Sequence, residues 1–159
     1  MSEAGAVGVR RQAEAVGSLV YVERRLFEQL GAVAGRLRAG WAGWASSASL
    51  RAAWRAEQLA ALLPVSVGLP APDDLVKPRQ AGLVEGLADL VSPPATGPDL
   101  GRNVLYLYDE LLAAYARELK NSSPVADEPY AIVLRRVMAD LGDDRSRLHR
   151  CVEAPGRST

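Results

Sequence analysis

The sequence predicts an all-α fold in which four long helices form two hairpins joined by one long connection. Apolar residues recur at helical spacing in four stretches, residues 18–37, 41–63, 103–121 and 129–152. Hydrophobic residues make up 48% of the 159 residues but aromatic residues only 6%, so Leu, Val and Ala must fill the core of a single domain. Seven of the ten prolines lie between Pro64 and Pro98, which excludes a long helix from that segment.

The first helix is expected to begin near Ser18, a good capping residue, after a flexible N-terminus over residues 1–17. Residues Gln12 to Val16 could extend this helix backwards. Its apolar positions repeat every seven residues in two series, Leu19–Leu26–Val33 and Leu30–Leu37. Glu23 falls in the second series, one heptad before Leu30, so a carboxylate is predicted on the inner face of this helix.

The second helix follows a tight turn near Ala39–Gly40 and carries the other candidate carboxylate, Glu57. The polar stripe of this helix is predicted to consist of Arg51, Arg55 and Gln58. Glu57 lies far from that stripe, on the face of Leu50, Trp54 and Ala61. Because Glu23 and Glu57 are about equally far from the turn, an antiparallel hairpin would place both at one level. They are therefore a candidate inward-facing pair; the alternative is that one or both lie at the wet end of the bundle.

The connection is expected to span residues 64–102 and to contain one short helix, Arg79–Val91. The third helix should run from about Asn103 to Asn121. Its inner stripe is predicted as Val104, Tyr108, Leu111, Leu112, Tyr115 and Leu119. Pro129 suits the first turn of the fourth helix, which should continue through Ile132, Leu134, Val137, Leu141 and Leu148 to about Val152. Residues 153–159 are expected to be a disordered tail, leaving 18–152 as the helical domain.

Two helical hairpins joined by one long connection make the topology of ferritin-like bundles. Three motifs occur in order in this chain: LFE-x-LG in YVERRLFEQLG, AW-x-AE in AWRAEQLAALLP, and PVAD-x-P in SSPVADEPYAIVLRRVMADLGDD. These segments resemble an uncharacterised family of ferritin-like proteins found mostly in actinobacteria. The resemblance implies a four-helix bundle with a second helix rich in His around AW-x-AE. The stretch from Ser47 to Arg55 departs from this pattern, because it contains no His.

Counting ligands argues against a standard metal site. A carboxylate-bridged dinuclear centre of this fold takes a Glu from each of two helices and a Glu-x-x-His pair from each of the other two. The carboxylates available, one per helix, are Glu23, Glu57, Glu110 and Asp140. Ala60 and Asp143 occupy the positions that need His, and the chain has one His in all, His149. The standard di-iron site is therefore lost, and only a carboxylate centre holding Mn or Fe would remain possible.

Inward carboxylates without a metal need another counter-charge. Asp144 and Arg145 straddle the inner seam of the fourth helix, so both are candidate site residues. We expect Arg145, or an arginine of the second helix, to place a guanidinium against Glu23 or Glu57. His149 and Cys151 lie near a helix end, where a dipole contact and ordinary packing explain them better than a metal or a nucleophile.

Composition narrows the classes of partner. The 19 basic and 19 acidic residues cancel and no basic patch stands out, so no nucleic-acid partner is expected. Neither a signal peptide nor an apolar run long enough for a membrane span is visible, and a single Cys favours a reducing compartment, so the predicted location is the cytoplasm.

Three functions fit these observations. The favoured hypothesis is a non-catalytic ferritin-like protein that acts as a binding or protein-interaction module, either as a homo-oligomer such as a dimer or with a protein partner. The first alternative is an oxidase or hydroxylase with a carboxylate-rich metal centre. The second is a binder of a small apolar ligand inside the bundle, with Glu23 or Glu57 as the polar anchor.

Overall fold

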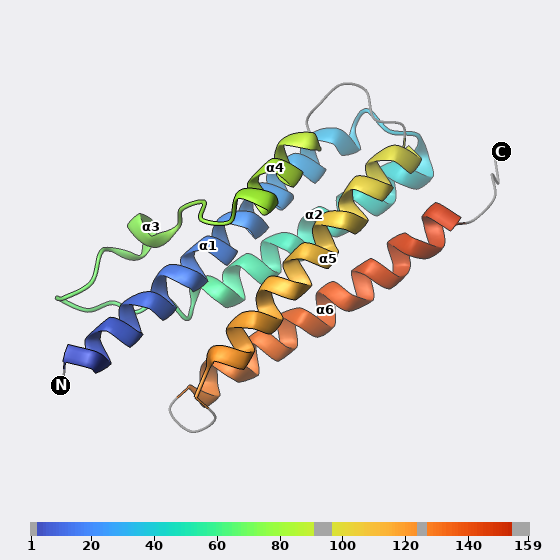
Figure 1. Ribbon diagram of the computed structural model, residues 1–159. Helices are drawn as coiled ribbons and strands as arrows, with labels where there is room; N and C mark the ends of the chain where they lie inside the picture. The colour runs from blue at the N-terminus through green and yellow to red at the C-terminus, as the bar shows by residue number, and fades with distance from the viewer. Residues whose placement is uncertain (1–2, 91–96, 124–126, 154–159) are drawn as a thin grey trace.

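The computed structural model describes residues 3–90, 97–123 and 127–153, and all regular structure within these ranges is helical. The helices are α1 (Glu3–Ala34), α2 (Ala39–Ala60), α3 (Pro72–Leu75), α4 (Ala81–Asp89), α5 (Gly97–Asn121) and α6 (Glu128–Glu153). The four long helices lie side by side, and the two short ones belong to the connection between α2 and α5 (Figure 1). The predicted all-α class is confirmed. None of the helices in the described ranges is both long and apolar enough to cross a membrane.

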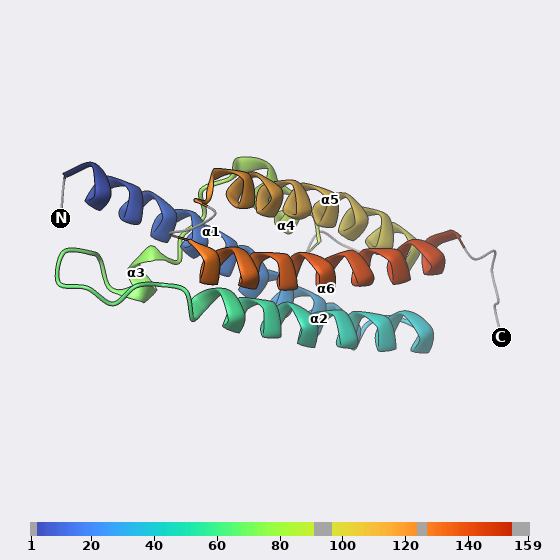
Figure 2. The ribbon, with the colours of Figure 1, turned by 90° about the horizontal axis from the view of Figure 1, so that it is seen from below.

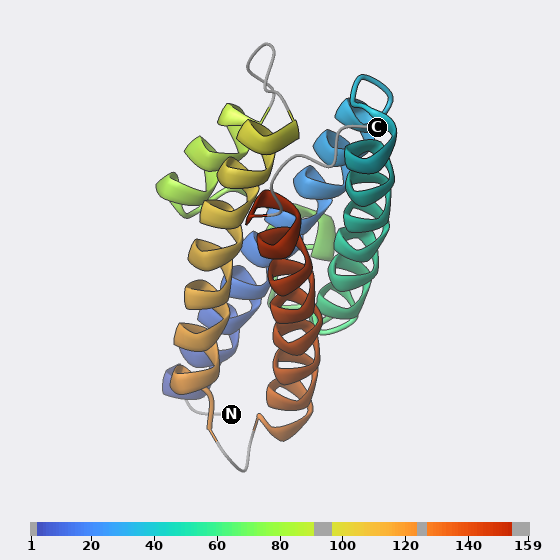
Figure 3. The same cartoon turned by 90° about the vertical axis from the view of Figure 1, so that its right-hand side faces the viewer.

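The order of the helices explains the long connection. α1 and α2 form one antiparallel hairpin, and α5 and α6 form another (Figures 1 and 3). α2 and α5 run in the same direction, so the chain must return along the bundle between them. During this return α3 packs against α1, and α4 packs against both α1 and α5. α6 lies between α2 and α5 in the view of Figure 2, where it can contact both.

Several element boundaries differ from the predictions. α1 begins at Glu3 rather than near Ser18, so the expectation of a flexible segment over 1–17 is wrong from Glu3 onward. Ala13 and Val16 are buried and continue the inner stripe backwards, which outweighs the glycines before them. α5 begins at Gly97, earlier than predicted. The short helix in the connection is confirmed as α4, while residues 154–159 of the predicted tail lie outside the described ranges.

The α1–α2 hairpin is packed through small side chains. Most of the buried residues of α2 are small, namely Ala45, Ala48, Ser49, Ala52 and Ala56. Ser49 Oγ donates a hydrogen bond to the Phe27 carbonyl oxygen at 2.8 Å, and a Cβ added to Gly31 would lie 3.2 Å from the same Oγ. Small residues let the two backbones approach closely, so α1 and α2 share a tight interface.

Glycines also mark close contacts between the connection and the long helices. A Cβ on Gly17 would lie 2.1 Å from the backbone oxygen of Leu75, so α3 sits directly on the backbone of α1. A Cβ on Gly97 would lie 2.4 Å from the ring of Trp41, which crosses the start of α5. These positions need glycine because of contact with a neighbour rather than because of backbone conformation.

The α5–α6 hairpin is packed through large side chains. Its buried residues include Leu107, Tyr108, Leu111, Tyr115, Leu134, Val137, Leu141 and Leu148. The predicted inner stripes of both helices largely agree with this set. Ile132, which α6 was also expected to include, lies within the helix but is 55% exposed and is not part of the core.

Candidate functional site

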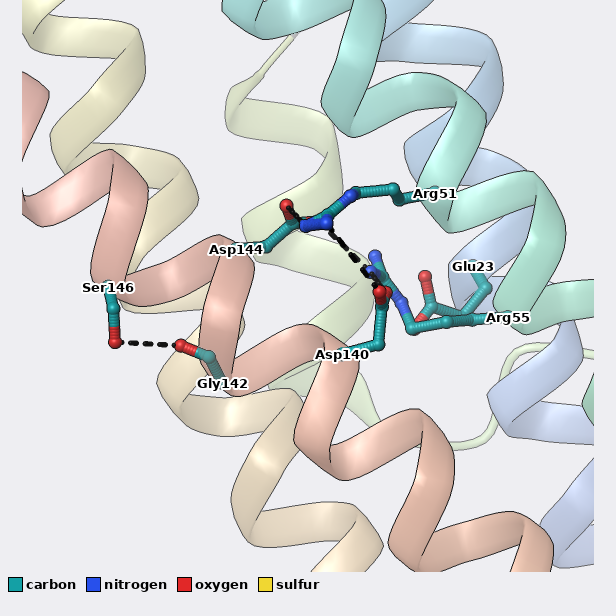
Figure 4. Close-up of polar contacts among 7 residues, drawn as sticks. All are labelled: Glu23, Arg51, Arg55, Asp140, Gly142, Asp144 and Ser146. Atoms are coloured by element: carbon teal, nitrogen blue, oxygen red, sulfur yellow. Dashed lines mark hydrogen bonds and ion pairs between the residues drawn. The ribbon is translucent and has the colours of Figure 1, made fainter.

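An arginine occupies the centre of the bundle. Arg55 of α2 has no exposed surface, and its guanidinium extends from α2 toward α6 (Figure 4). Its Nε lies 2.7 Å from Oε1 of Glu23, which is equally buried on α1. Its Nη1 lies 2.8 Å from Oδ2 of Asp140 and 3.1 Å from Oδ2 of Asp144, both on α6. One guanidinium therefore joins three helices.

Two further side chains complete the charged cluster. Arg51 lies one helical turn before Arg55, and its Nη1 is 2.6 Å from Oδ1 of Asp144. Tyr115 of α5 donates a hydrogen bond from its hydroxyl to Oε1 of Glu23 at 2.6 Å. Glu23, Arg51, Arg55, Tyr115, Asp140 and Asp144 form what we call the arginine cluster. It brings all four long helices together, with two guanidiniums facing three carboxylates.

The arginine cluster runs from the buried core to partly exposed side chains of α2 and α6. The side chains of Glu23 and Arg55 are 0% exposed, whereas those of Arg51 and Asp140 are 26% and 22% exposed. Oε2 of Glu23 and Nη2 of Arg55 are buried and have no hydrogen-bond partner within the described part of the chain. A buried ion pair with unpaired polar atoms adds little net stability, because the cost of dehydrating the charges offsets their attraction. Removing one partner is nevertheless destabilising, because the other charge is then left buried and alone.

Burial and neighbouring charges shift the pKa values of three residues of the arginine cluster. Burial disfavours the charge of Arg55, but the negative charge and hydrogen bond of Glu23 outweigh it and raise the pKa of Arg55 above its usual value. Burial, and after it the charge of Glu23, raises the pKa of Tyr115, so its hydroxyl remains a donor. Burial also raises the pKa of Asp144, although Arg55 and Arg51 both act to lower it.

Of the four candidate site residues, the structure brings Glu23 and Asp144 together and leaves the other two outside. Glu57 is exposed on α2, so the expectation that it faces inward is wrong. Arg145 is also outside: its guanidinium pairs with Asp109 at the surface, and the arginine that meets Glu23 is Arg55. Glu110, the third-helix carboxylate in the possible metal set, is only half-buried.

The helical phase of α2 explains both corrections. Large side chains predicted the inner face at Leu50 and Trp54, but Leu50 is 69% exposed. The true inner face is the series of alanines at spacings of three and four residues that ends at Leu59. Arg55 lies three residues after Ala52 and therefore belongs to that series. The spacing of small residues is the signal in the sequence that could have identified it.

The residues at the centre do not fit a dinuclear metal site. A guanidinium occupies the position between Glu23 and the α6 carboxylates, where a cation would have to bind (Figure 4). Over the described ranges, no group of three or more His, Cys, Asp or Glu side chains is arranged to hold a metal ion. His149, the one imidazole, lies 3.1 Å from Glu153 near the end of α6, and Cys151 is exposed there.

Comparison with known proteins adds no assignment: the chain matches no protein-family model, and neither a curated protein nor a solved structure is similar enough to count as a match.

Proposed function

We propose that this chain is a non-catalytic ferritin-like protein of the cytoplasm that acts as an interaction module. The observation that carries the proposal is the place of Arg55, whose guanidinium pairs with carboxylates from α1 and α6 in the bundle core, where ferritin-like bundles build their metal sites from facing helices. The order of two hairpins joined by a long connection supports the ferritin-like part. A buried guanidinium supplies positive charge permanently, so these carboxylates have a counter-charge without a metal ion.

Metal loading and dioxygen consumption test the non-catalytic part. Purified protein is incubated anaerobically with ferrous iron, or separately with manganese, and metal content is measured after desalting. We expect no stoichiometric metal, and no dioxygen consumption above the rate of iron in buffer when air is admitted. Bound metal or rapid oxidation that disappears in a folded Glu23→Gln variant would contradict the proposal and favour the oxidase alternative.

The partner that fits the surface best is a second copy of the chain, bound through the outer side of α2. Residues 39–50 contain no charged side chain. The exposed residues on one side of this stretch include Gly43, Ser46, Ser47 and Leu50, and we call these four the outer α2 face. Small residues allow close approach of two helices, and an uncharged face can meet its own copy across a two-fold axis without repulsion.

Sedimentation velocity over a range of concentrations tests this self-association. We expect a dimer for the wild-type protein and a monomer for Leu50→Glu, because a charge on the outer α2 face would be buried in the interface without a partner. Ile132→Glu is the matched control, since Ile132 is 55% exposed on α6 and should leave the dimer intact. A wild-type protein that stays monomeric at high micromolar concentration would exclude the outer α2 face as a dimer interface.

A further inference from the structure

The outer side of α2 carries a pattern of large and small residues that extends beyond the outer α2 face. α2 lies at one edge of the bundle, and no other helix of the described ranges covers this side (Figures 2 and 3). All residues at helical spacing here are exposed except the last, which is partly buried: Ala39, Gly43, Ser46, Ser47, Leu50 and Trp54. The first four are small, and the last two are large.

This pattern is complementary to itself when two copies of α2 run antiparallel. Such copies are related by a two-fold axis perpendicular to both helices, so a residue before the axis faces one equally far behind it. If the axis passes next to Ser47, Gly43 faces Leu50 of the second copy. Ala39 likewise faces Trp54, so each large side chain meets a small one. A parallel pair would instead place Leu50 against Leu50 and leave space at Gly43.

The charges at the two ends of α2 are complementary in the same arrangement. Glu57 is exposed one turn after Trp54, and Arg36 and Arg38 are exposed in the turn before α2. None of these three side chains forms an ion pair within the described part of the chain. At about 1.5 Å of rise per residue, Glu57 lies about 16 Å from the axis and Arg38 about 13 Å on its other side. The axis therefore brings Glu57 of each copy close to the arginines of the other.

We propose that α2 binds α2 of a second copy in the antiparallel direction. Leu50 packs over the partner's Gly43, and Glu57 pairs with the arginines of the partner's turn, Arg36 and Arg38. Both contacts occur twice because the dimer is symmetric. This inference rests on the proposed self-association and adds its direction and its ion pairs. It gives an intersubunit role to Glu57, which takes no part in the arginine cluster.

Disulfide crosslinking of the full chain tests the direction. Cys151→Ser first removes the exposed native thiol, and Gly43→Cys and Leu50→Cys are then made in separate chains. A disulfide needs Cα atoms within about 7 Å, whereas antiparallel pairing sets equal positions about 10 Å apart along the helices. We expect crosslinked dimers in a mixture of the two chains, at least fivefold more than in either chain alone.

Two outcomes of the crosslinking would overturn the antiparallel direction. One is equal crosslinking of the mixture and of the separate chains, which a parallel pair would give. The other is no crosslinking in a mixture that still sediments as a dimer. A wild-type protein that sediments as a monomer would overturn the self-association as well, so the two failures are distinguishable.

Charge reversal tests the ion pairs, with dimer affinity measured by sedimentation velocity. Glu57→Arg should weaken the dimer about tenfold, because it places like charges together in both symmetric contacts. Adding Arg36→Glu and Arg38→Glu should restore most of the affinity, since each pair is then reversed. Glu85→Arg is the control, because Glu85 is exposed on α4, which packs against α1 and α5. Unchanged affinity in Glu57→Arg, an equal loss in the control, or no restoration in the triple variant would overturn the ion pairs.

Discussion

The two helical hairpins are packed by side chains of different size. α1 and α2 meet through alanine, serine and glycine, whereas α5 and α6 meet through leucine, valine and tyrosine. A helix face made of alanines leaves space beyond it, and the long side chain of Arg55 extends through that space to α6. The large residues of the second hairpin fill their own interface and contribute short polar groups, such as Asp140 and the hydroxyl of Tyr115. Small-residue packing is thus what permits a buried arginine here.

The largest effect is expected from removing the charge that crosses between the hairpins. Arg55→Met leaves Glu23 buried without its guanidinium and should lower the free energy of unfolding by about 3–5 kcal/mol. Urea unfolding followed by circular dichroism measures this loss. Arg145→Met is the matched control, because it breaks a surface pair with Asp109 and should cost less than about 1 kcal/mol. Equal losses of unfolding free energy in the two variants would show that the buried ion pairs of Arg55 matter no more for stability than a surface pair.

Removing volume from one hairpin and adding volume to the other should both be destabilising. Leu111→Ala in α5 opens a cavity in the interface of large side chains and should cost about 2–5 kcal/mol. Ala52→Leu in α2 adds volume where both backbones are close and should cost about 1–3 kcal/mol. Urea unfolding of both variants makes the comparison. If Ala52→Leu proved neutral, the α1–α2 interface would be looser than the contacts at Ser49 and Gly31 indicate.

A pair of glycine substitutions compares close contact with open space. Gly17→Ala would push α3 away from α1, giving up part of the burial of Leu75, with a net loss of about 1–2 kcal/mol after the gain in helix propensity. Gly142→Ala on α6 meets no neighbouring atom and should be stabilising by up to about 1 kcal/mol. Hydrogen exchange should show faster opening of residues 72–76 in the first variant alone. Stabilisation by both variants would contradict the seating of α3 on Gly17.

The smallest effect concerns the pH dependence of the arginine cluster. Burial raises the pKa of Asp144 in the folded protein, so the folded state holds this proton more tightly than the unfolded chain does. As pH rises from the ordinary Asp pKa of about 3.9 through the raised folded value, ionisation of Asp144 therefore reduces stability. The difference in unfolding free energy between the wild-type protein and Asp144→Asn should shift toward the wild type as pH falls from 7 to about 4. A shift toward Asp144→Asn would mean that Arg51 and Arg55 outweigh burial.

Much of the architecture could be predicted because the spacing of apolar residues along the chain indicates a helix whatever the helix packs against. The stripes of α5 and α6, the short turn before α2 and the short helix between prolines all follow from spacing and from the absence of a backbone donor in proline. The extension of α1 before Ser18 goes with the burial of Ala13 and Val16, and the early start of α5 goes with the contact between Gly97 and the ring of Trp41. Neither depends on a capping residue that could be recognised in the sequence.

The candidate site was predicted only in part. Glu23 belongs to a strong leucine series, so its inward position could be read from α1 alone. Glu57 and Leu50 were misplaced because large side chains usually define the inner face, whereas in α2 alanines define it. Tyr115 lay in a predicted apolar stripe, but the bond from its hydroxyl to Glu23 depends on how α5 is placed against α1.

The residue order alone establishes the helical class, the long connection and the scarcity of histidine, because each of these depends on neighbours along the chain or on composition. Which charge meets Glu23 depends on the rotation of α2 about its own axis. That rotation is set by how closely α1 and α2 can approach, which is a property of two packed surfaces and not of either helix alone.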